Sequence, residues 1–274
     1  MGKRVFLFVL DGFGVGECED SYKFGDEGSN TFQNVNDIVP LKIPFLTSIG
    51  LKNIDGLKFE KVHALGTYGK LRELSQGKDT TTGHFEMMGI ISKKAMPTFP
   101  NGFPDEIIEK LESAFGTKVL GNVVASGTQI IQELGEEHIK TGYPIVYTSA
   151  DSVLQIAAHT DIVPLEKLYE YCAKAREIMC GDYAVGRVIA RPFIGEINHF
   201  ERNNEGRKDF SLIPDKNNSM KRIFDAGIDV VSVGKISEIF ADQSITEKHL
   251  NHNNHDALIE TKKIQQNLDK GFVF

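Results

Sequence analysis

The run Arg4-Val5-Phe6-Leu7-Phe8-Val9-Leu10, directly followed by Asp11, constrains the fold more than any other feature of this chain. Such an apolar run predicts a buried parallel strand, because strands of this kind are covered on both faces. The strand would deliver the Asp11 carboxylate to the carboxyl edge of a sheet, where α/β proteins bind ligands. For an isolated Asp-Gly after a strand, binding to turn amides is the alternative role.

A second motif runs from Gly77 to Glu86 with the sequence GKDTTTGHFE. Its three threonines stand between glycines and just before an apolar segment, which predicts that a threonine lies at or near a helix start. Free backbone N–H groups at such a position bind phosphate. Together with Asp11, the motif indicates a metal-dependent phosphoryl-transfer enzyme, whereas a threonine-rich turn on its own is usually a helix cap.

The order of turn residues and periodic segments predicts two α/β domains. Residues 1–93 suggest alternating strands and helices, and a cluster of prolines and Gly102 between 97 and 104 marks a boundary. The next region predicts the following elements: helices at 104–116, 128–140 and 165–179, and strands at 144–149, 153–157 and 186–191.

A further change near residue 219 suggests that the first domain resumes there. The sequence predicts a helix at 220–226, a buried strand at 228–234 and a helix at 257–268. We therefore expect a core domain of residues 1–93 and 220–274, interrupted by a cap domain of residues 94–219.

Composition excludes some partners and compartments. A net charge of −7 argues against nucleic acid as the main partner, because binding a polyanion needs a basic face. Cys18, Cys172 and Cys180 form no metal-type pair and suggest reduced thiols in a cytoplasmic protein. No apolar stretch approaches the ~20 residues of a membrane-spanning helix. The amino terminus leads directly into the first predicted strand, so no signal peptide is expected.

Four motifs in this order resemble the phosphopentomutases of the alkaline phosphatase superfamily: VLDGFGVGE at 9–17, GKDTTTGHFEMMG at 77–89, YTSADSVLQIAAH at 147–159 and GRVIARPFIGE at 186–196. The resemblance implies an α/β fold, with an alkaline-phosphatase-like core sheet and an inserted α/β cap. It also implies an isomerase of nucleotide salvage that interconverts ribose 1-phosphate and ribose 5-phosphate, and their deoxy counterparts. Family members use two manganese ions, a phosphorylated threonine and a sugar bisphosphate as activator.

The resemblance also implies roles for particular residues. The matching aspartate is a manganese ligand in the family, which assigns that role to Asp11. The pattern K-D-T-x-T-G-H places the phosphorylated residue at Thr80, with Thr81 and Thr82 as less favoured candidates. His84 is expected to orient the loop or a ligand, or to make a structural hydrogen bond.

Substrate-binding residues are expected mainly in the cap. Guanidinium groups bind phosphate bidentately, and Arg187 and Arg191 alternate on one face of a predicted strand. The complete predicted set is Ser149, Asp151, Arg187, Arg191, Arg202 and Lys235, whereas Arg207 is expected to lie on a solvated face. Asp151 would accept sugar hydroxyls or cap a turn.

The family continues beyond the point at which this chain stops, so the resemblance implies a core incomplete at its C-terminal end. Asp11 is the only family metal ligand present, and we expect no turnover from this chain alone. His249, His252, His255 and Asp256 have a polar-loop context that disfavours a metal site. Two alternatives remain open: another phosphomutase or phosphatase of the superfamily, and an inactive remnant that binds phosphosugars through its cap.

Overall fold

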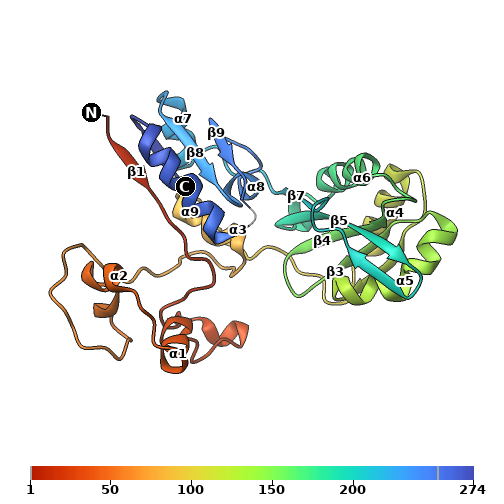
Figure 1. Cartoon of the computed structure of the whole chain (residues 1–274). Helices are drawn as coiled ribbons and strands as arrows, with labels where there is room; N and C mark the ends of the chain where they lie inside the picture. The colour runs from red at the N-terminus through yellow and green to blue at the C-terminus, as the bar shows by residue number, and fades with distance from the viewer. Residues whose placement is uncertain (1, 252) are drawn as a thin grey trace. The chain divides into compact units, whose positions relative to one another are not determined.

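The structure is a computed structural model that describes residues 2–251 and 253–274. The chain divides into two compact units. The larger unit combines the residues up to Phe6 with Ser75–Phe274, and the smaller unit is Leu7–Leu74. The larger unit contains two separate β-sheets (Figure 1). A core domain over 1–93 and 220–274, and a cap over 94–219, stay predictions.

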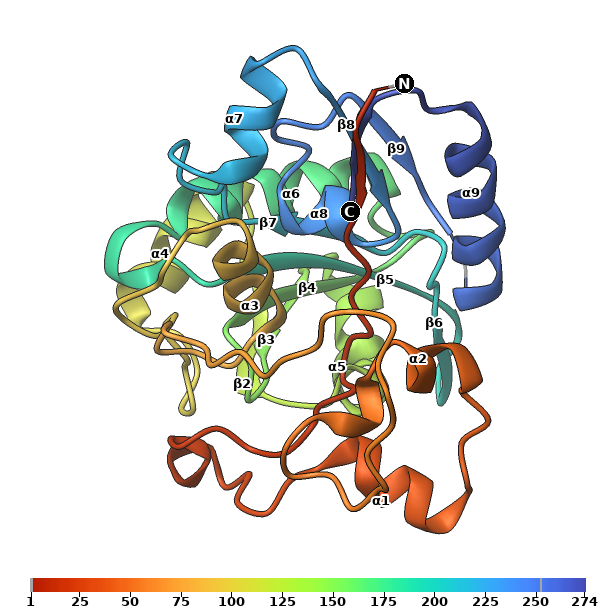
Figure 2. The same cartoon turned by 90° about the vertical axis from the view of Figure 1, so that its left-hand side faces the viewer.

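The first sheet is entirely parallel. Its strands lie in the order β1 (Arg4–Phe6), β10 (Gly271–Val273), β8 (Asp229–Val233) and β9 (Glu247–His249). Helix α9 (Asn254–Asn267) covers one face, where Ile264 packs with Val231 and Val273 (Figure 2). The predicted strand at 228–234 and helix at 257–268 are confirmed, because apolar periodicity specified both.

Three short helices lie near the opposite face of this sheet: α3 (Thr80–Met87), α7 (Ser219–Asp225) and α8 (Ile236–Ile239). The Phe85 ring of α3 lies 5.3 Å from that of Phe240, and the His84 ring lies 5.9 Å from that of Phe274. These contacts fix α3 near the carboxyl end of β8, which is the edge where parallel sheets bind ligands.

The first predicted strand is wrong in its extent and in its burial. Strand β1 ends at Phe6, and Val5 and Leu10 are 57% and 61% exposed. The parallel pairing is nevertheless present, with Arg4 opposite Gly271. The difference arises because β1 pairs with β10 alone in the described sheet and the chain enters the smaller unit at Leu7.

The smaller unit consists mainly of loops. Its helical elements are η1 (Ser21–Phe24), α1 (Thr31–Ile38), α2 (Pro44–Ser48) and η2 (Leu51–Asn53), and no strand is assigned over 7–74. The predicted alternation of strands and helices across the first 93 residues is therefore wrong. Phe32 is fully buried between the rings of Phe13 and Phe59, and the Asn53 amide bonds to the backbone of Val62 in place of a strand ladder.

The second sheet is mixed. Its order is β2 (Leu120–Val124), β3 (Ile145–Thr148), β4 (Val153–His159), β5 (Arg187–Glu196) and β6 (His199–Arg202), and β7 (Lys208–Ser211) also pairs with β5. β2 and β3 are parallel, as are β4 and β5, and the other pairs are antiparallel. The start of β5 pairs with β7 and its end pairs with β6, so β5 organises this region.

Helices cover both faces of the second sheet (Figure 1). Helices α4 (Asp105–Phe115) and α6 (Leu165–Ile178) pack on the face that carries Leu154 and Val188, while α5 (Gly127–Thr141) packs on the face of Tyr147 and Phe193. The predicted helices and strands of this region are confirmed within a few residues. No helix of the described ranges is long and apolar enough to cross a membrane.

A buried histidine gives this region a predicted acid sensitivity. His138 is fully buried, its Nδ1–H donates to the Tyr143 carbonyl at 2.7 Å, and its Nε2 accepts from the His159 N–H at 2.9 Å. Both bonds suit the neutral ring, and burial lowers the pKa of His138 despite the opposing bond to Tyr143.

Since the folded-state pKa lies below the unfolded value, the stabilisation is present above about pH 6.5 and is lost as the pH falls. We expect the free energy of unfolding to fall by up to about 1.4 kcal/mol per pH unit for this residue. Urea unfolding of the chain and of His138→Gln between pH 7.5 and 5 measures this slope. An equal slope in both proteins would assign the acid sensitivity to other groups.

Candidate functional site

Thr80 is the first residue of α3, and the preceding Asp79 caps the helix. The Asp79 carboxylate accepts from the Thr82 N–H at 3.0 Å, as expected for an aspartate at an N-cap. This cap leaves the Thr80 side chain at the helix start, as the sequence predicted. The position combines a hydroxyl with the positive end of a helix, where a phosphate is favoured.

The three threonines have different surroundings, which separates the candidates for phosphorylation. Thr81 and Thr82 are fully buried, and the Thr82 hydroxyl donates to Asp79 Oδ2 at 2.6 Å. Thr80 is only partly buried. A phosphoryl donor therefore meets the Thr80 hydroxyl most directly, in agreement with the choice made from the sequence pattern.

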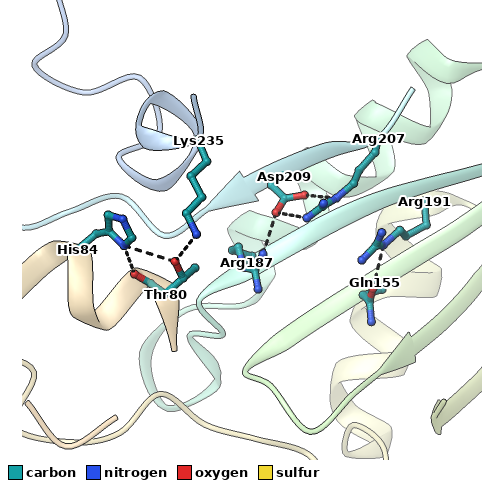
Figure 3. A network of polar contacts seen from close by, with 8 residues as sticks. All are labelled: Thr80, His84, Gln155, Arg187, Arg191, Arg207, Asp209 and Lys235. Carbon is teal, nitrogen blue, oxygen red and sulfur yellow. Dashed lines mark hydrogen bonds and ion pairs between the residues drawn. The ribbon is translucent and has the colours of Figure 1, made fainter. Parts of the chain in front are cut away.

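Lys235 comes to Thr80 from a distant part of the chain. It lies just beyond the carboxyl end of β8, and its Nζ donates to Thr80 Oγ1 at 2.8 Å (Figure 3). Burial lowers the pKa of this lysine from its usual range. An ammonium group at this distance would stabilise negative charge that develops on the threonine oxygen or on a phosphate attached to it.

His84 supports the threonine without acting as its base. Its Nδ1 lies 2.7 Å from the Thr80 carbonyl oxygen, so this nitrogen carries a proton and donates (Figure 3). The same nitrogen lies 3.4 Å from Thr80 Oγ1 and has no lone pair left to take its proton. Burial lowers the pKa of His84, which keeps the ring neutral. The structural bond foreseen for His84 is confirmed.

Arg187, at the start of β5, forms an ion pair that the sequence analysis missed. Its NH1 lies 3.1 Å from Asp209 Oδ2, and the Arg207 side chain binds the same carboxylate at 2.8 and 3.0 Å (Figure 3). The Asp209 side chain is only 5% exposed. The alternating segment at 208–211 could have suggested a strand that carries Asp209, but its pairing with β5 has no local signal.

Arg191 lies on the same face of β5 as Arg187 but has a different partner. Its Nε donates to Gln155 Oε1 at 3.0 Å (Figure 3). The two arginines are four residue steps apart, which corresponds to about 13 Å along β5. The shared face is as predicted, and the substrate role of the two arginines stays a prediction.

Ser149 and Asp151 lie in the loop that joins β3 to β4. Val153, at the start of β4, pairs with Arg187 in β5, so this loop and Arg187 lie at the same end of the sheet. Gly186 at that end lies against α3, because a Cβ added to it would come 3.6 Å from Thr81 Oγ1. Asp151 is exposed and available for sugar hydroxyls, and its substrate role stays a prediction.

Arg202, the last residue of β6, points toward the first turn of α5. An added Cβ at Gly127 would lie 3.0 Å from its NH2. Asp11 belongs to the smaller unit, in the turn closed by the bond from the Phe13 N–H to the Leu10 carbonyl. Its role as a metal ligand stays a prediction.

The described residues contain no group of three or more His, Cys, Asp or Glu side chains that could hold a metal ion. His249 pairs with Glu247 and Glu260, while His252 lies outside the described residues. A two-metal site needs more ligands than one aspartate. The predicted manganese centre therefore stays a prediction.

Comparison with known proteins decides the family. A phosphopentomutase of Caldanaerobacter subterraneus subsp. tengcongensis is 54% identical over 276 residues, which cover 100% of this chain and 70% of the relative. The chain belongs to the phosphopentomutase family. Relatives of the same name from Acetivibrio thermocellus and Carboxydothermus hydrogenoformans are 50% and 49% identical, each over 99% of this chain and 71% of the relative. No family model matches the chain.

Membership of the phosphopentomutase family confirms the resemblance drawn from the four motifs, and it agrees with the mixed α/β architecture. The chain spans about 70% of the length of these relatives. Two predicted site residues, Thr80 and Lys235, are in contact, and Arg187 lies at the start of β5, next to Gly186, which lies against α3. Arg191 and Arg202 are not brought to Thr80 by any contact within the described residues.

Proposed function

We propose that this protein is a phosphopentomutase, an intramolecular phosphotransferase that interconverts ribose 1-phosphate and ribose 5-phosphate and their deoxy counterparts. The main structural support for this proposal is the hydrogen bond from Lys235 Nζ to the Thr80 hydroxyl oxygen. Phosphorylated Thr80 would first give its phosphoryl group to the free hydroxyl of the bound pentose phosphate: the bond from Thr80 Oγ1 to phosphorus breaks, a bond from the sugar oxygen to phosphorus forms, and the proton of the sugar hydroxyl passes to the threonine oxygen or to solvent. After the bisphosphate intermediate reorients, Thr80 Oγ1 would form a bond to the other phosphorus, the bond from that phosphorus to its sugar oxygen breaks, and the threonine proton passes to the sugar oxygen or to solvent.

The residues around Thr80 support this exchange in distinct ways. Lys235 balances the negative charge on the phosphorylated threonine, and the positive end of the α3 helix dipole stabilises the same negative charge. Arg187, held by Asp209, would orient the sugar phosphate, while Ser149 and Asp151 would bind sugar hydroxyls. Water must be kept from the phosphothreonine, because hydrolysis would make the enzyme a phosphatase.

Manganese, a sugar bisphosphate activator, phosphorylation of Thr80 and a cytoplasmic location are parts of the same proposal. Bound manganese would act as a Lewis acid toward phosphoryl oxygens, with Asp11 as the one proposed ligand of this chain. Three unpaired cysteines support a reducing compartment. The net charge of −7 supports small phosphates rather than nucleic acid as partners.

Calorimetry with the 274-residue chain tests the substrate class. Ribose 5-phosphate should bind, whereas 3-phosphoglycerate at the same concentration should give no heat above dilution. The reverse preference would favour a three-carbon phosphomutase. We also expect no conversion of ribose 1-phosphate by this chain alone with manganese and a bisphosphate, because Asp11 is its one proposed metal ligand and a two-metal site needs several ligands. Turnover that depends on Thr80, in a preparation free of other fragments, would contradict that expectation.

Lys235→Met should weaken ribose 5-phosphate binding by about 1.5–3 kcal/mol, since it removes a charge-assisted hydrogen-bond donor. The lowered pKa of Lys235 adds a pH signature. Binding by the unmodified chain should decline as the pH rises through that pKa, and the variant should lack this decline. Lys248→Met is the matched control, because Lys248 is exposed and pairs with Asp242. If Lys235→Met and Lys248→Met bind ribose 5-phosphate with equal affinity, Lys235 does not take part in substrate binding.

A further inference from the structure

Ser152 and Gly186, which directly precede β4 and β5, hold both segments that connect the second sheet with the first (Figure 1). Ser152 Oγ donates to the Pro97 carbonyl at 2.6 Å, which fixes the connection from α3 to α4, and it accepts from the Gly186 N–H at 3.3 Å. The Leu212 N–H donates to the Gly186 carbonyl at 3.0 Å and fixes the connection from β7 to α7. Both connections therefore reach the second sheet at the Ser152–Gly186 pair.

Helix α3, which packs on the first sheet, contacts the same pair. A Cβ added at Gly186 would lie 3.6 Å from Thr81 Oγ1, 3.4 Å from the Ser152 carbonyl oxygen and 2.9 Å from Met96 Sδ. Thr81 directly follows Thr80 in the first turn of α3. The contact between the two sheets at this point therefore lies one residue from the threonine proposed to carry the phosphate.

The Thr81 hydroxyl is a buried donor that lacks an acceptor. The side chain is fully buried, and Oγ1 has no hydrogen-bond partner in residues 2–251 and 253–274. A threonine inside a helix can donate to the carbonyl four residues earlier, but Thr81 is the second residue of α3 and has no helical carbonyl at that position. Since buried donors are almost always satisfied, the acceptor must come from outside the helix.

The Ser152 carbonyl oxygen is the acceptor that the geometry favours. It lies, like Thr81 Oγ1, within 3.6 Å of the position of an added Cβ at Gly186, but the two oxygens are not hydrogen-bonded in this structure. A rotation of the second sheet about the Ser152–Gly186 pair would bring them together while both connections stay attached. Ile213, which follows Leu212, is 63% exposed, so this connection is not held in a core that would resist the rotation.

We propose that Thr81 is a positioning residue whose hydroxyl donates to the Ser152 carbonyl when the second sheet closes over α3, with the Ser152–Gly186 pair as the pivot. Closure then acts on the first turn of α3, directly beside Thr80, and keeps water from that residue. The link to phosphoryl transfer rests on the proposed function, whereas the pivot and the hydrogen bond do not.

Single-molecule energy transfer between two dyes measures the closed fraction of the 274-residue chain, with and without ribose 5-phosphate. The dyes are attached through Glu137→Cys in α5 and Lys262→Cys in α9, two exposed positions, in a background that carries Cys18→Ser and Cys180→Ser. Cys172 is buried and stays unlabelled. A minor closed population should be present without ligand and should grow when ribose 5-phosphate is added. Absence of a closed population in both conditions would overturn the proposal.

Thr81→Val removes the hydroxyl and keeps a branched side chain. The ligand-free variant should melt at an equal or higher temperature, because the hydroxyl has no partner in the open arrangement. Its closed fraction should nevertheless fall about fivefold, the effect of one hydrogen bond on an equilibrium. Thr81→Ser keeps the hydroxyl and should restore the closed fraction. A lower melting temperature with an unchanged closed fraction would give Thr81 a merely structural role and overturn the assignment.

Gly186→Ala tests the pivot in the absence of ligand. Its methyl group would occupy the space in which Thr81 Oγ1 and the Ser152 carbonyl converge, so the closed fraction should fall at least fivefold. Gly206→Ala is the matched control, because its Cβ would lie 2.8 Å from Leu165 Cδ2, away from α3. Equal closed fractions in the two variants would overturn the pivot. If these ligand-free differences hold but ribose 5-phosphate does not change the closed fraction, the result contradicts the proposed function and supports the pivot.

Discussion

Replacing Thr80 by alanine is expected to abolish the phosphoenzyme and to lower turnover by about 10⁴-fold or more, as loss of a nucleophile does in other covalent enzymes. The measurement uses this chain continued by the remaining portion of the Caldanaerobacter relative, incubated with a sugar bisphosphate and followed by intact mass and peptide mapping. Thr80→Ser should retain phosphorylation at the same position, because it keeps a hydroxyl at the start of α3.

Thr82→Val is the matched control for this result. It removes the hydroxyl that donates to Asp79 at 2.6 Å but leaves the backbone cap of the helix in place. We expect it to lower stability modestly and to leave phosphorylation at Thr80. Phosphate found on Thr82, with Thr80 unmodified, would show that the burial of Thr82 in this structure does not decide which threonine reacts.

Local signals account for the parts of the fold that were predicted correctly. Helix α4 begins after Pro104 and ends at Gly116, whose φ of 73° is the left-handed conformation that glycine adopts without strain. Strand β8 and helix α9 follow from apolar periodicity. These features depend on residues close in sequence, so a single chain is sufficient to reveal them.

The errors arose where long-range packing decides the outcome. The run at 4–10 has the composition of a buried strand, yet β1 lies at the edge of its sheet and its strand geometry ends at Phe6. Apolar composition does not show how many neighbours a strand will have. The same limit explains why the sequence pattern predicts alternating strands and helices over residues 7–74, where the structure has mainly loops.

The residues of the candidate site show the same contrast between local sequence signals and long-range packing. Thr80 and Lys235 were named from their motifs, but a contact between residues 155 positions apart follows only from the packing of α3 on the first sheet. Asp209 was missed since its partners depend on the pairing of β7 with β5.

Asp209→Ala should have the second largest effect, a loss of about 3 kcal/mol in the free energy of unfolding. Removing one partner of a buried ion pair leaves the other charge uncompensated, which typically costs about 3–5 kcal/mol. The lower value applies because the Arg207 side chain is 38% exposed and water can solvate it, whereas Arg187 is 21% exposed. Urea unfolding of the 274-residue chain measures the loss.

The partners of Asp209 make this prediction specific. Asp209→Asn keeps an oxygen acceptor and the side-chain shape, so it should lose less stability than the alanine variant. Adding Arg187→Met to Asp209→Ala should restore part of the loss, because it removes the charge that Asp209 compensates. The same carboxylate holds Arg187 in place, so Asp209→Asn should also weaken ribose 5-phosphate binding. If Asp209→Ala loses less than about 1 kcal/mol, the value of an exposed pair, the carboxylate does not organise this arginine cluster.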